Sequence, residues 1–106
     1  MFYYCTSLTS IPYLDTSSVT NMDYMCSNCS SLITVKTLFT NSVTDTFCMF
    51  ENCEKISSIT FKGGFNTDTT YMFKNINRTG VFYHDDNDYY EIISSLPSTW
   101  THELIA

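Results

Sequence analysis

Hydrophobic residues recur along this chain at an almost constant interval. The methionines at positions 1, 25, 49 and 72 are spaced by 24, 24 and 23 residues. Four further columns of mostly apolar residues keep this spacing: Phe2, Cys26, Phe50 and Phe73; Cys5, Cys29, Cys53 and Ile76; Leu8, Leu32, Ile56 and Thr79; Ile11, Val35, Ile59 and Phe82. A single unit of this kind cannot bury its apolar side, whereas stacked units bury the columns as one continuous core. The pattern therefore predicts a repeat protein of the solenoid type.

Within each unit the pattern predicts one short helix and one short strand. In the second unit, apolar residues at positions 22, 25, 26 and 29 follow the spacing of one helix face, and residues 46–53 and 69–76 repeat it. An Asn or Asp precedes each helix and is a typical N-terminal cap: Asn21, Asp45 and Asp68. An Asn near each helix end tolerates the left-handed conformation that ends helices: Asn28, Asn52 and Asn75. The β-prone segments SLTSI, SLITV and KISSITF follow and predict a ladder of parallel strands.

Residues 14–35, LDTSSVTNMDYMCSNCSSLITV, resemble the repeat of BspA-like leucine-rich-repeat surface proteins, whose units run approximately LDTSxVTxMxxMFxxCxSLTxI. The third unit matches this repeat through Val43, Thr44 and Asp45, and again at Met49, Phe50, Cys53 and Ile56. The resemblance extends over about residues 1–82, although Cys26 replaces the usual Phe and Gly63 and Gly64 interrupt the unit that follows. It implies a surface protein of bacteria or parasitic protists, or a phage tail component, with a role in adhesion. The family has no motif that defines its binding residues.

The predicted fold class is an α/β repeat, a leucine-rich-repeat-type solenoid with short parallel strands, short helices and a C-terminal helical cap. We expect one solenoid domain over residues 1–106, with repeats at 1–21, 22–45, 46–68 and 69–83 and the cap at 84–106. Asp88 is placed to cap a helix with Tyr90, Ile93 and Leu96 on its apolar side, and Trp100 to cover the last unit. The chain begins inside the first predicted helix. This start favours the C-terminal piece of a longer array over a complete small protein whose open N-terminal end docks on another subunit.

Charge and hydropathy exclude two classes of partner. Residues 79–106 carry five acidic residues and no Lys or Arg, whereas residues 1–78 carry six acidic and five basic residues. An acidic surface cannot release counterions from nucleic acid, and it is repelled by anionic lipid. No apolar run approaches the roughly 20 residues of a spanning helix, so we expect no membrane insertion. Through the resemblance, we expect an extracellular, cell-surface or virion location.

Residue types with catalytic or metal-binding potential are present, but their arrangement predicts neither role. Cys26 and Cys29 form a CxxC without the second such pair typical of a zinc site. Residues 85–88, DDND, lack the glycine and closing glutamate of a calcium loop, so we interpret them as a solvated turn. His84 beside Asp85 has no serine or cysteine placed near it. We expect no enzyme, metal or cofactor.

One column predicts a binding surface. Tyr24, Cys48 and Tyr71 share it, and we expect it to be half-exposed, with Cys48 as the most reactive thiol. Tyrosine supplies a large contact area at a low cost in side-chain entropy. We therefore expect an adhesion module that contacts a host protein or glycan. The alternative is a structural subunit of a virion or surface layer that associates with neighbouring subunits through its N-terminal end, which the oligomeric state would reveal.

Overall fold

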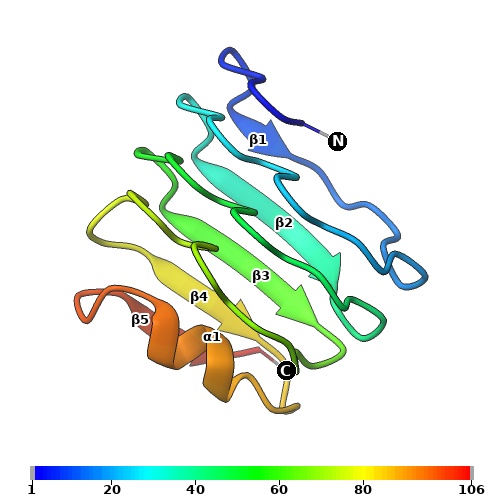
Figure 1. The fold of residues 1–106 in the computed structure, drawn as a ribbon. Coiled ribbons are helices and arrows are strands. Elements are labelled where there is room, and N and C mark those ends of the chain that lie inside the picture. Colours follow the sequence, from blue (N-terminus) through cyan, green and yellow to red (C-terminus); the bar gives the residue numbers. More distant parts are fainter. Residues whose placement is uncertain (1, 106) are drawn as a thin grey trace.

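A parallel β-sheet runs from one end of the molecule to the other (Figure 1). The computed structural model describes residues 2–105. The sheet contains β1 (Ser10–Ile11), β2 (Thr34–Phe39), β3 (Ser58–Lys62), β4 (Val81–His84) and β5 (Thr101–Leu104), in sequence order and with every neighbouring pair parallel. One helix, α1 (Tyr90–Ser95), lies between β4 and β5 in the chain. The chain winds through about four turns of a solenoid, which confirms the predicted repeat architecture with short parallel strands. We call each turn a coil.

The strand register has the same period as the sequence columns. Ser10 pairs with Thr34, Thr34 with Ser58, and Ser58 with Val81, so each step between coils equals one repeat. The column that follows these residues is fully buried: Ile11, Val35, Ile59 and Phe82. Because side chains alternate between the two faces of a strand, this register places one apolar residue of every coil in the same core layer.

The prediction of a short helix within each repeat is wrong. Residues 22–29, 46–53 and 69–76 form turn segments that cross one face of the sheet (Figure 1). In the first two of these segments alternate N–H groups donate to the next coil: that of Tyr24 bonds to the Phe47 carbonyl at 2.8 Å, and that of Cys26 to the Met49 carbonyl at 2.8 Å. The intervening N–H groups donate three residues back within their own coil. Neighbouring coils thus satisfy the donors that a helix would satisfy internally.

The predicted helix caps instead organise turns. The Asn21 side chain accepts the N–H of Asp23 at 2.8 Å, and the Asp68 side chain accepts that of Thr70 at 3.1 Å, the two-residue reach of an Asx turn. The predicted left-handed conformation is confirmed at all three asparagines of the other column, with φ of 60°, 61° and 57° at Asn28, Asn52 and Asn75. Their side-chain amides bond from coil to coil at 2.9 Å per step.

The core lies between the sheet and the turn segments. Its buried side chains include the predicted methionine and cysteine columns of the second and third coils: Met25, Met49, Cys29 and Cys53. Cys5, predicted to be buried in the same column, is exposed because the first coil contacts a neighbouring coil on one side only. Met1 lies outside the described residues.

Residues 89–100 lie over the β4 coil. The Asp88 carboxylate accepts the N–H of Tyr90 at 3.0 Å, but the N-cap residue of α1 is Tyr89, which makes no side-chain cap bond, so the predicted cap at Asp88 is wrong by one residue. Of the predicted apolar side, Leu96 is buried and Ile93 packs against the core, but Tyr90 is 70% exposed and the buried helix residue is Ile92. The Trp100 indole donates to the Asn77 carbonyl at 2.8 Å. Its ring lies so close to Gly80 that a Cβ added there would be 2.6 Å away, which leaves room for glycine alone.

Candidate functional site

Four exposed aromatic rings, one from each coil, form a continuous row across the turn segments. We call Tyr3, Tyr24, Phe47 and Tyr71 the aromatic ladder. Successive ring centroids are 5.8, 5.6 and 5.7 Å apart, and each ring meets the next edge to face. The four side chains are 53%, 40%, 39% and 56% exposed. They are four of the nine large hydrophobic residues that are exposed within the described residues. Their centroid distances are those of favourable aromatic pairs.

The ladder draws on more than one sequence column. Tyr24 and Tyr71 belong to the predicted column, whereas Phe47 lies one residue before it and Tyr3 belongs to another. Sequence reasoning missed Phe47 and Tyr3 because a column links residues in equivalent positions, while rings of this size reach across to neighbouring columns. The signal that could have found Phe47 was its place directly before a column otherwise occupied by tyrosine.

Cys48, the third predicted site residue, is only 4% exposed, so the expectation of a half-exposed reactive thiol is wrong. It lies behind the ladder, with Tyr24 and Glu51 as its neighbours. Desolvation by burial, together with the nearby Glu51 carboxylate, raises the pKa of the Cys48 thiol. Because the thiolate is the nucleophile, this environment makes Cys48 unreactive. Its place in the site is behind the surface that a ligand would touch.

A cation already lies on the ladder. The Lys74 ammonium is 5.3 Å from the centroid of the Tyr71 ring, within the range of a cation–π contact. In the same repeat column as Lys74, the Glu51 carboxylate accepts the Ser27 hydroxyl at 3.2 Å. This carboxylate also contributes to the raised pKa of Tyr24, after desolvation and Cys48.

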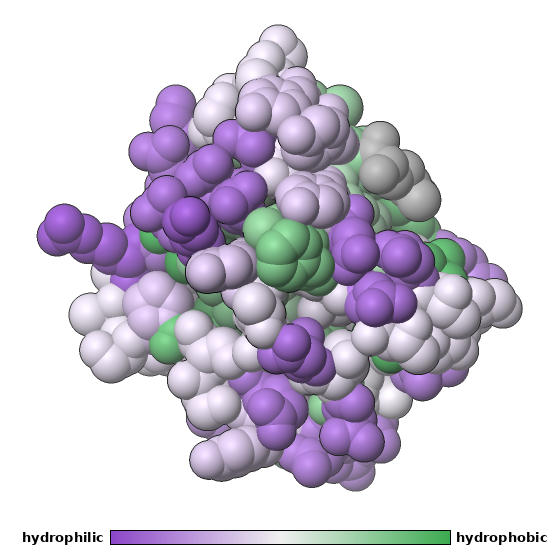
Figure 2. Space-filling view, in the orientation of Figure 1, coloured by the Kyte–Doolittle hydropathy of each residue, from purple (hydrophilic) through white to green (hydrophobic). Residues whose placement is uncertain are grey.

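Three carboxylates lie beside the ladder. Asp23, Asp45 and Asp68 line a hollow of about 100 Å³ together with Phe47 and nearby threonines, and we call it the acidic hollow. The Asp23 carboxylate accepts the Phe47 N–H at 2.8 Å, which fixes the first of these groups next to the ring. Figure 2 shows the face that the turn segments cover, where small hydrophobic areas in green are bordered by hydrophilic side chains in purple.

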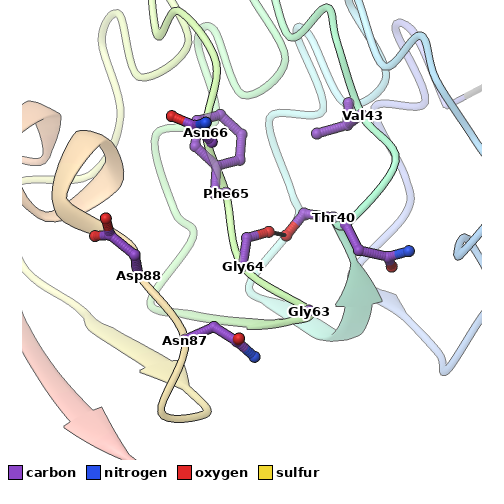
Figure 3. Close-up of a pocket in the computed structure, with 9 residues that line it drawn as sticks. Thr40, Val43, Gly63, Gly64, Phe65, Asn66, Asn87 and Asp88 are labelled. Atoms are coloured by element: carbon purple, nitrogen blue, oxygen red, sulfur yellow. Dashed lines mark hydrogen bonds between the residues drawn. The ribbon is translucent and has the colours of Figure 1, made fainter.

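A second, larger hollow of about 460 Å³ opens where β3 ends (Figure 3). Thr40, Gly63, Gly64, Asn87 and Asp88 are among its lining residues. Gly63 and Gly64 have φ of 92° and 87°, a conformation that side chains rarely adopt. The Thr40 hydroxyl donates to the Gly64 carbonyl within the hollow (Figure 3). This hollow is polar, and its central groups bond one another.

The loop after β4 is held by one carboxylate. Asp85 accepts the Gly63 N–H at 3.0 Å, the Asn87 N–H at 3.2 Å and the Tyr89 hydroxyl at 2.7 Å. Partial desolvation opposes ionisation, but these bonds outweigh it and hold the pKa of Asp85 at about 2. Burial in turn raises the pKa of Tyr89, the hydroxyl that donates to this carboxylate.

His84 is engaged at both ring nitrogens. Its Nδ1 lies 2.7 Å from the Asp85 carbonyl, and its Nε2 lies 3.0 Å from Nδ1 of His102. Sequence reasoning missed His102, which stands 18 residues away and approaches only because β5 pairs with β4. A general base needs a free nitrogen within reach of the proton it removes. The geometry therefore gives His84 a structural role, in which it links β4 to β5 through His102.

All five cysteines are free thiols. Desolvation by burial raises the pKa of Cys53 to about 12 and that of Cys26 still further. The Cys53 thiol donates to the Cys26 carbonyl at 3.0 Å. Within residues 2–105, no group of three or more His, Cys, Asp or Glu residues is placed to hold a metal ion. No helix in the same range is long and apolar enough to span a bilayer.

A family model described as a Mycoplasma protein of unknown function, DUF285, matches residues 1–87. The chain belongs to the DUF285 family. The DUF285 match includes every predicted repeat and ends before α1. DUF285 is associated with BspA-like surface proteins, in agreement with the resemblance seen in the repeats. No curated protein and no solved structure matches the chain.

Proposed function

We propose that this DUF285 chain is a non-enzymatic binding module that contacts a protein or glycan of a host through its aromatic ladder. The observation that carries the proposal is the ladder itself, a row of four mutually packed rings that are 39% to 56% exposed. Contiguous exposed apolar surface on a folded domain commonly marks an interaction site. The proposal includes a location outside the cell, on a cell surface or on a virion.

The ladder has the properties of a preorganised contact surface. Each ring is held by its neighbour, and the backbone beneath Tyr24 is fixed by the bond from its N–H to the Phe47 carbonyl. Rings that are ordered before binding lose little side-chain entropy in a complex. Aromatic residues are also the most enriched type at the energetic centre of protein interfaces.

The architecture belongs to the same proposal. We assign the solenoid to the leucine-rich-repeat class, in a form in which turn segments take the place of helices. We also assign residues 84–106 as the closing element of the stack. Two contacts support this role: β5 pairs with β4 along the sheet edge, and Trp100 packs on Gly80.

The test is a pair of double variants screened on printed arrays of synthetic peptides and glycans. Tyr24→Asn with Tyr71→Asn removes two rings and keeps a residue that tolerates the left-handed φ of both positions. Tyr13→Asn with Tyr90→Asn is the control, because both tyrosines are exposed but lie outside the ladder. We expect the ladder variant to lose about tenfold or more in affinity for the features that the wild-type chain binds, and the control to lose less than about twofold.

The proposal fails if the arrays contain no feature whose binding depends on Tyr24 and Tyr71. Circular dichroism and thermal unfolding of both double variants show whether the fold is retained, so that a lost signal reports on the rings. If both double variants keep strong binding, the contact lies elsewhere on the chain, and the proposal that the ladder is the binding surface is rejected as well.

A further inference from the structure

The acidic hollow and the aromatic ladder share one residue. Phe47 lines the hollow with Asp23, Asp45 and Asp68, and its ring stands between those of Tyr24 and Tyr71 in the ladder. Aromatic faces and carboxylates both attract cations, the first through the ring quadrupole and the second through charge. The hollow thus joins two features that favour the same kind of ligand group.

The carboxylates of the hollow keep acceptor capacity. Within the described residues, the hydrogen bonds that they accept come from hydroxyl and backbone N–H groups: Thr44 hydroxyl to Asp45 at 3.0 Å, Phe47 N–H to Asp23 at 2.8 Å, and the Thr70 hydroxyl and N–H to Asp68 at 2.6 and 3.1 Å. A carboxylate has about four lone-pair sites, so each of the three has sites left. None of these donors brings a positive charge to the hollow.

The size of the hollow suits the head of a side chain. Its volume of about 100 Å³ is a few times the roughly 30 Å³ that one water occupies in the liquid. An ammonium or guanidinium group is of this size, whereas a sugar ring is larger. Guanidinium also bonds carboxylates through two parallel N–H groups and stacks on aromatic faces.

The charge of the surrounding surface selects among protein partners. Residues 21–29, 45–53 and 68–76, which carry the ladder and the hollow, hold four acidic residues (Asp23, Asp45, Glu51 and Asp68) and one basic residue, Lys74. Lys74 over the Tyr71 ring shows that this surface accepts a cation next to an aromatic ring. A second copy of the chain would bring mostly like charge, and so would nucleic acid, so complementarity favours a basic segment of a different protein.

We infer that the partner of the ladder is a protein segment rich in arginine or lysine, and that the acidic hollow beside Phe47 receives one of its cationic side chains. This inference rests on the proposed function and names the chemistry of the partner. The apolar stem of the basic residue lies along the ladder while its head enters the hollow, as long basic side chains commonly do on mixed surfaces.

The test uses fluorescein-labelled Gly-Ser peptides that carry spaced arginines, with matched peptides in which glutamine or glutamate replaces every arginine. Binding is measured by fluorescence anisotropy. Asp45→Asn with Asp68→Asn removes two charges from the hollow and keeps an oxygen to accept the threonine donors. Asp86→Asn with Glu91→Gln removes the same charge at two exposed positions outside the hollow.

We expect the arginine peptide to bind at least about tenfold more tightly than the glutamine peptide, and the glutamate peptide not to bind. The hollow variant should lose about tenfold in affinity for the arginine peptide, against less than about twofold for the matched control. Equal losses in the two doubles would show attraction to net charge alone and would overturn the inference. No preference for arginine over glutamine would overturn it as well.

Failure of this inference is distinguishable from failure of the proposed function. If neutral peptides or glycans on the arrays bind in a manner that depends on Tyr24 and Tyr71, the ladder remains the binding surface and only the basic partner is rejected. If nothing binds in that manner, both are rejected together.

Discussion

Left-handed backbone at two positions per coil explains why the repeats are turns. Seven residues other than glycine have φ between 54° and 61°, in two columns: Tyr4, Asn28, Asn52 and Asn75, and Tyr24, Cys48 and Tyr71. Asparagine adopts this conformation at a small cost, so its column was predictable, whereas tyrosine and cysteine adopt it at a cost of about 1–2 kcal/mol each. Bonds between coils offset that cost, as the bond from the Tyr24 N–H shows.

Substitutions at Asn52 separate two contributions to stability: the left-handed backbone and the hydrogen bonds between asparagine side chains of neighbouring coils. Asn52→Ala and Asn52→Gly both remove the amide that bonds Asn28 and Asn75, but only alanine opposes the φ of 61°. We expect Asn52→Ala to lower the free energy of unfolding by about 1 kcal/mol more than Asn52→Gly. Urea unfolding of the two variants and the wild type measures this difference. Equal losses would mean that the backbone at Asn52 relaxes out of the left-handed region.

Thiol reactivity distinguishes the predicted cysteine from the exposed one. Cys5 is exposed, whereas Cys48 is 4% exposed and the other three thiols are fully buried. We expect a disulfide reagent such as Ellman's to modify one thiol rapidly in the folded chain, and Cys5→Ser to abolish that phase. Cys48→Ser is the control and should leave the rapid phase intact. A rapid phase that disappears in Cys48→Ser instead would contradict the burial of that side chain.

At the scale of elements, each coil bonds its neighbours on two sides. The strands form one set of hydrogen bonds between coils, and the alternate N–H groups of the turn segments form a second set on the opposite side of the core. The segments mimic the apolar spacing of a helix because residues three and four apart turn inward in both structures. Periodicity alone could not distinguish them, since the deciding bonds join residues a full repeat apart.

The Asp85 carboxylate, which accepts a hydrogen bond from Gly63 after β3, gives the fold a contact that is sensitive to acid. The pKa of Asp85 is held at about 2 by its hydrogen bonds, below the value near 4 of an unfolded chain. A depressed carboxyl pKa stabilises the fold above the unfolded value, and the contribution disappears as the pH falls from about 4 to about 2. Because the group is partly exposed, we expect about 1 kcal/mol.

Asp85→Asn tests this contact. The variant should be about 1 kcal/mol less stable than the wild type at neutral pH. The difference should shrink as the pH falls from about 4 and vanish below about pH 2, because the wild-type carboxyl is then protonated as well. Urea unfolding at a series of pH values measures it. Asp86→Asn is the matched control, with an exposed carboxylate next in the chain, and should follow the wild type throughout. A difference between Asp85→Asn and wild type that does not change with pH would reject the assignment to charge.

At the scale of the whole molecule, the sequence predicted what repeats and missed what does not. The solenoid, the parallel strands and their register follow from columns such as Val35 and Ile59, because burial in a stacked core demands an apolar residue at every step. The ladder was half predicted, through Tyr24 and Tyr71. Phe47 and the acidic hollow depend on contacts across columns, which no alignment of the repeats displays.

Stacking also predicts how the molecule opens. Strands β2, β3 and β4 have a paired neighbour on each side, whereas β1 and β5 each have one, and every residue of β5 is exposed. In a stack where each coil contacts only its neighbours, stability is roughly a sum of coil and interface contributions, and opening begins at the ends. We therefore expect the amide hydrogens of β2, β3 and β4 to exchange most slowly with solvent and those of β1 and β5 most rapidly.

Hydrogen exchange measured by nuclear magnetic resonance tests this order on the 106-residue chain. Phe50→Ala sharpens the result, because this fully buried ring stacks on Phe61 and Phe73 in the middle of the stack. Its loss should destabilise the fold by about 3–5 kcal/mol and bring the protection of β2 and β3 down towards that of β1. Uniform protection of all strands in the wild type would show that the coils unfold as one unit, since partial opening would then contribute nothing to exchange.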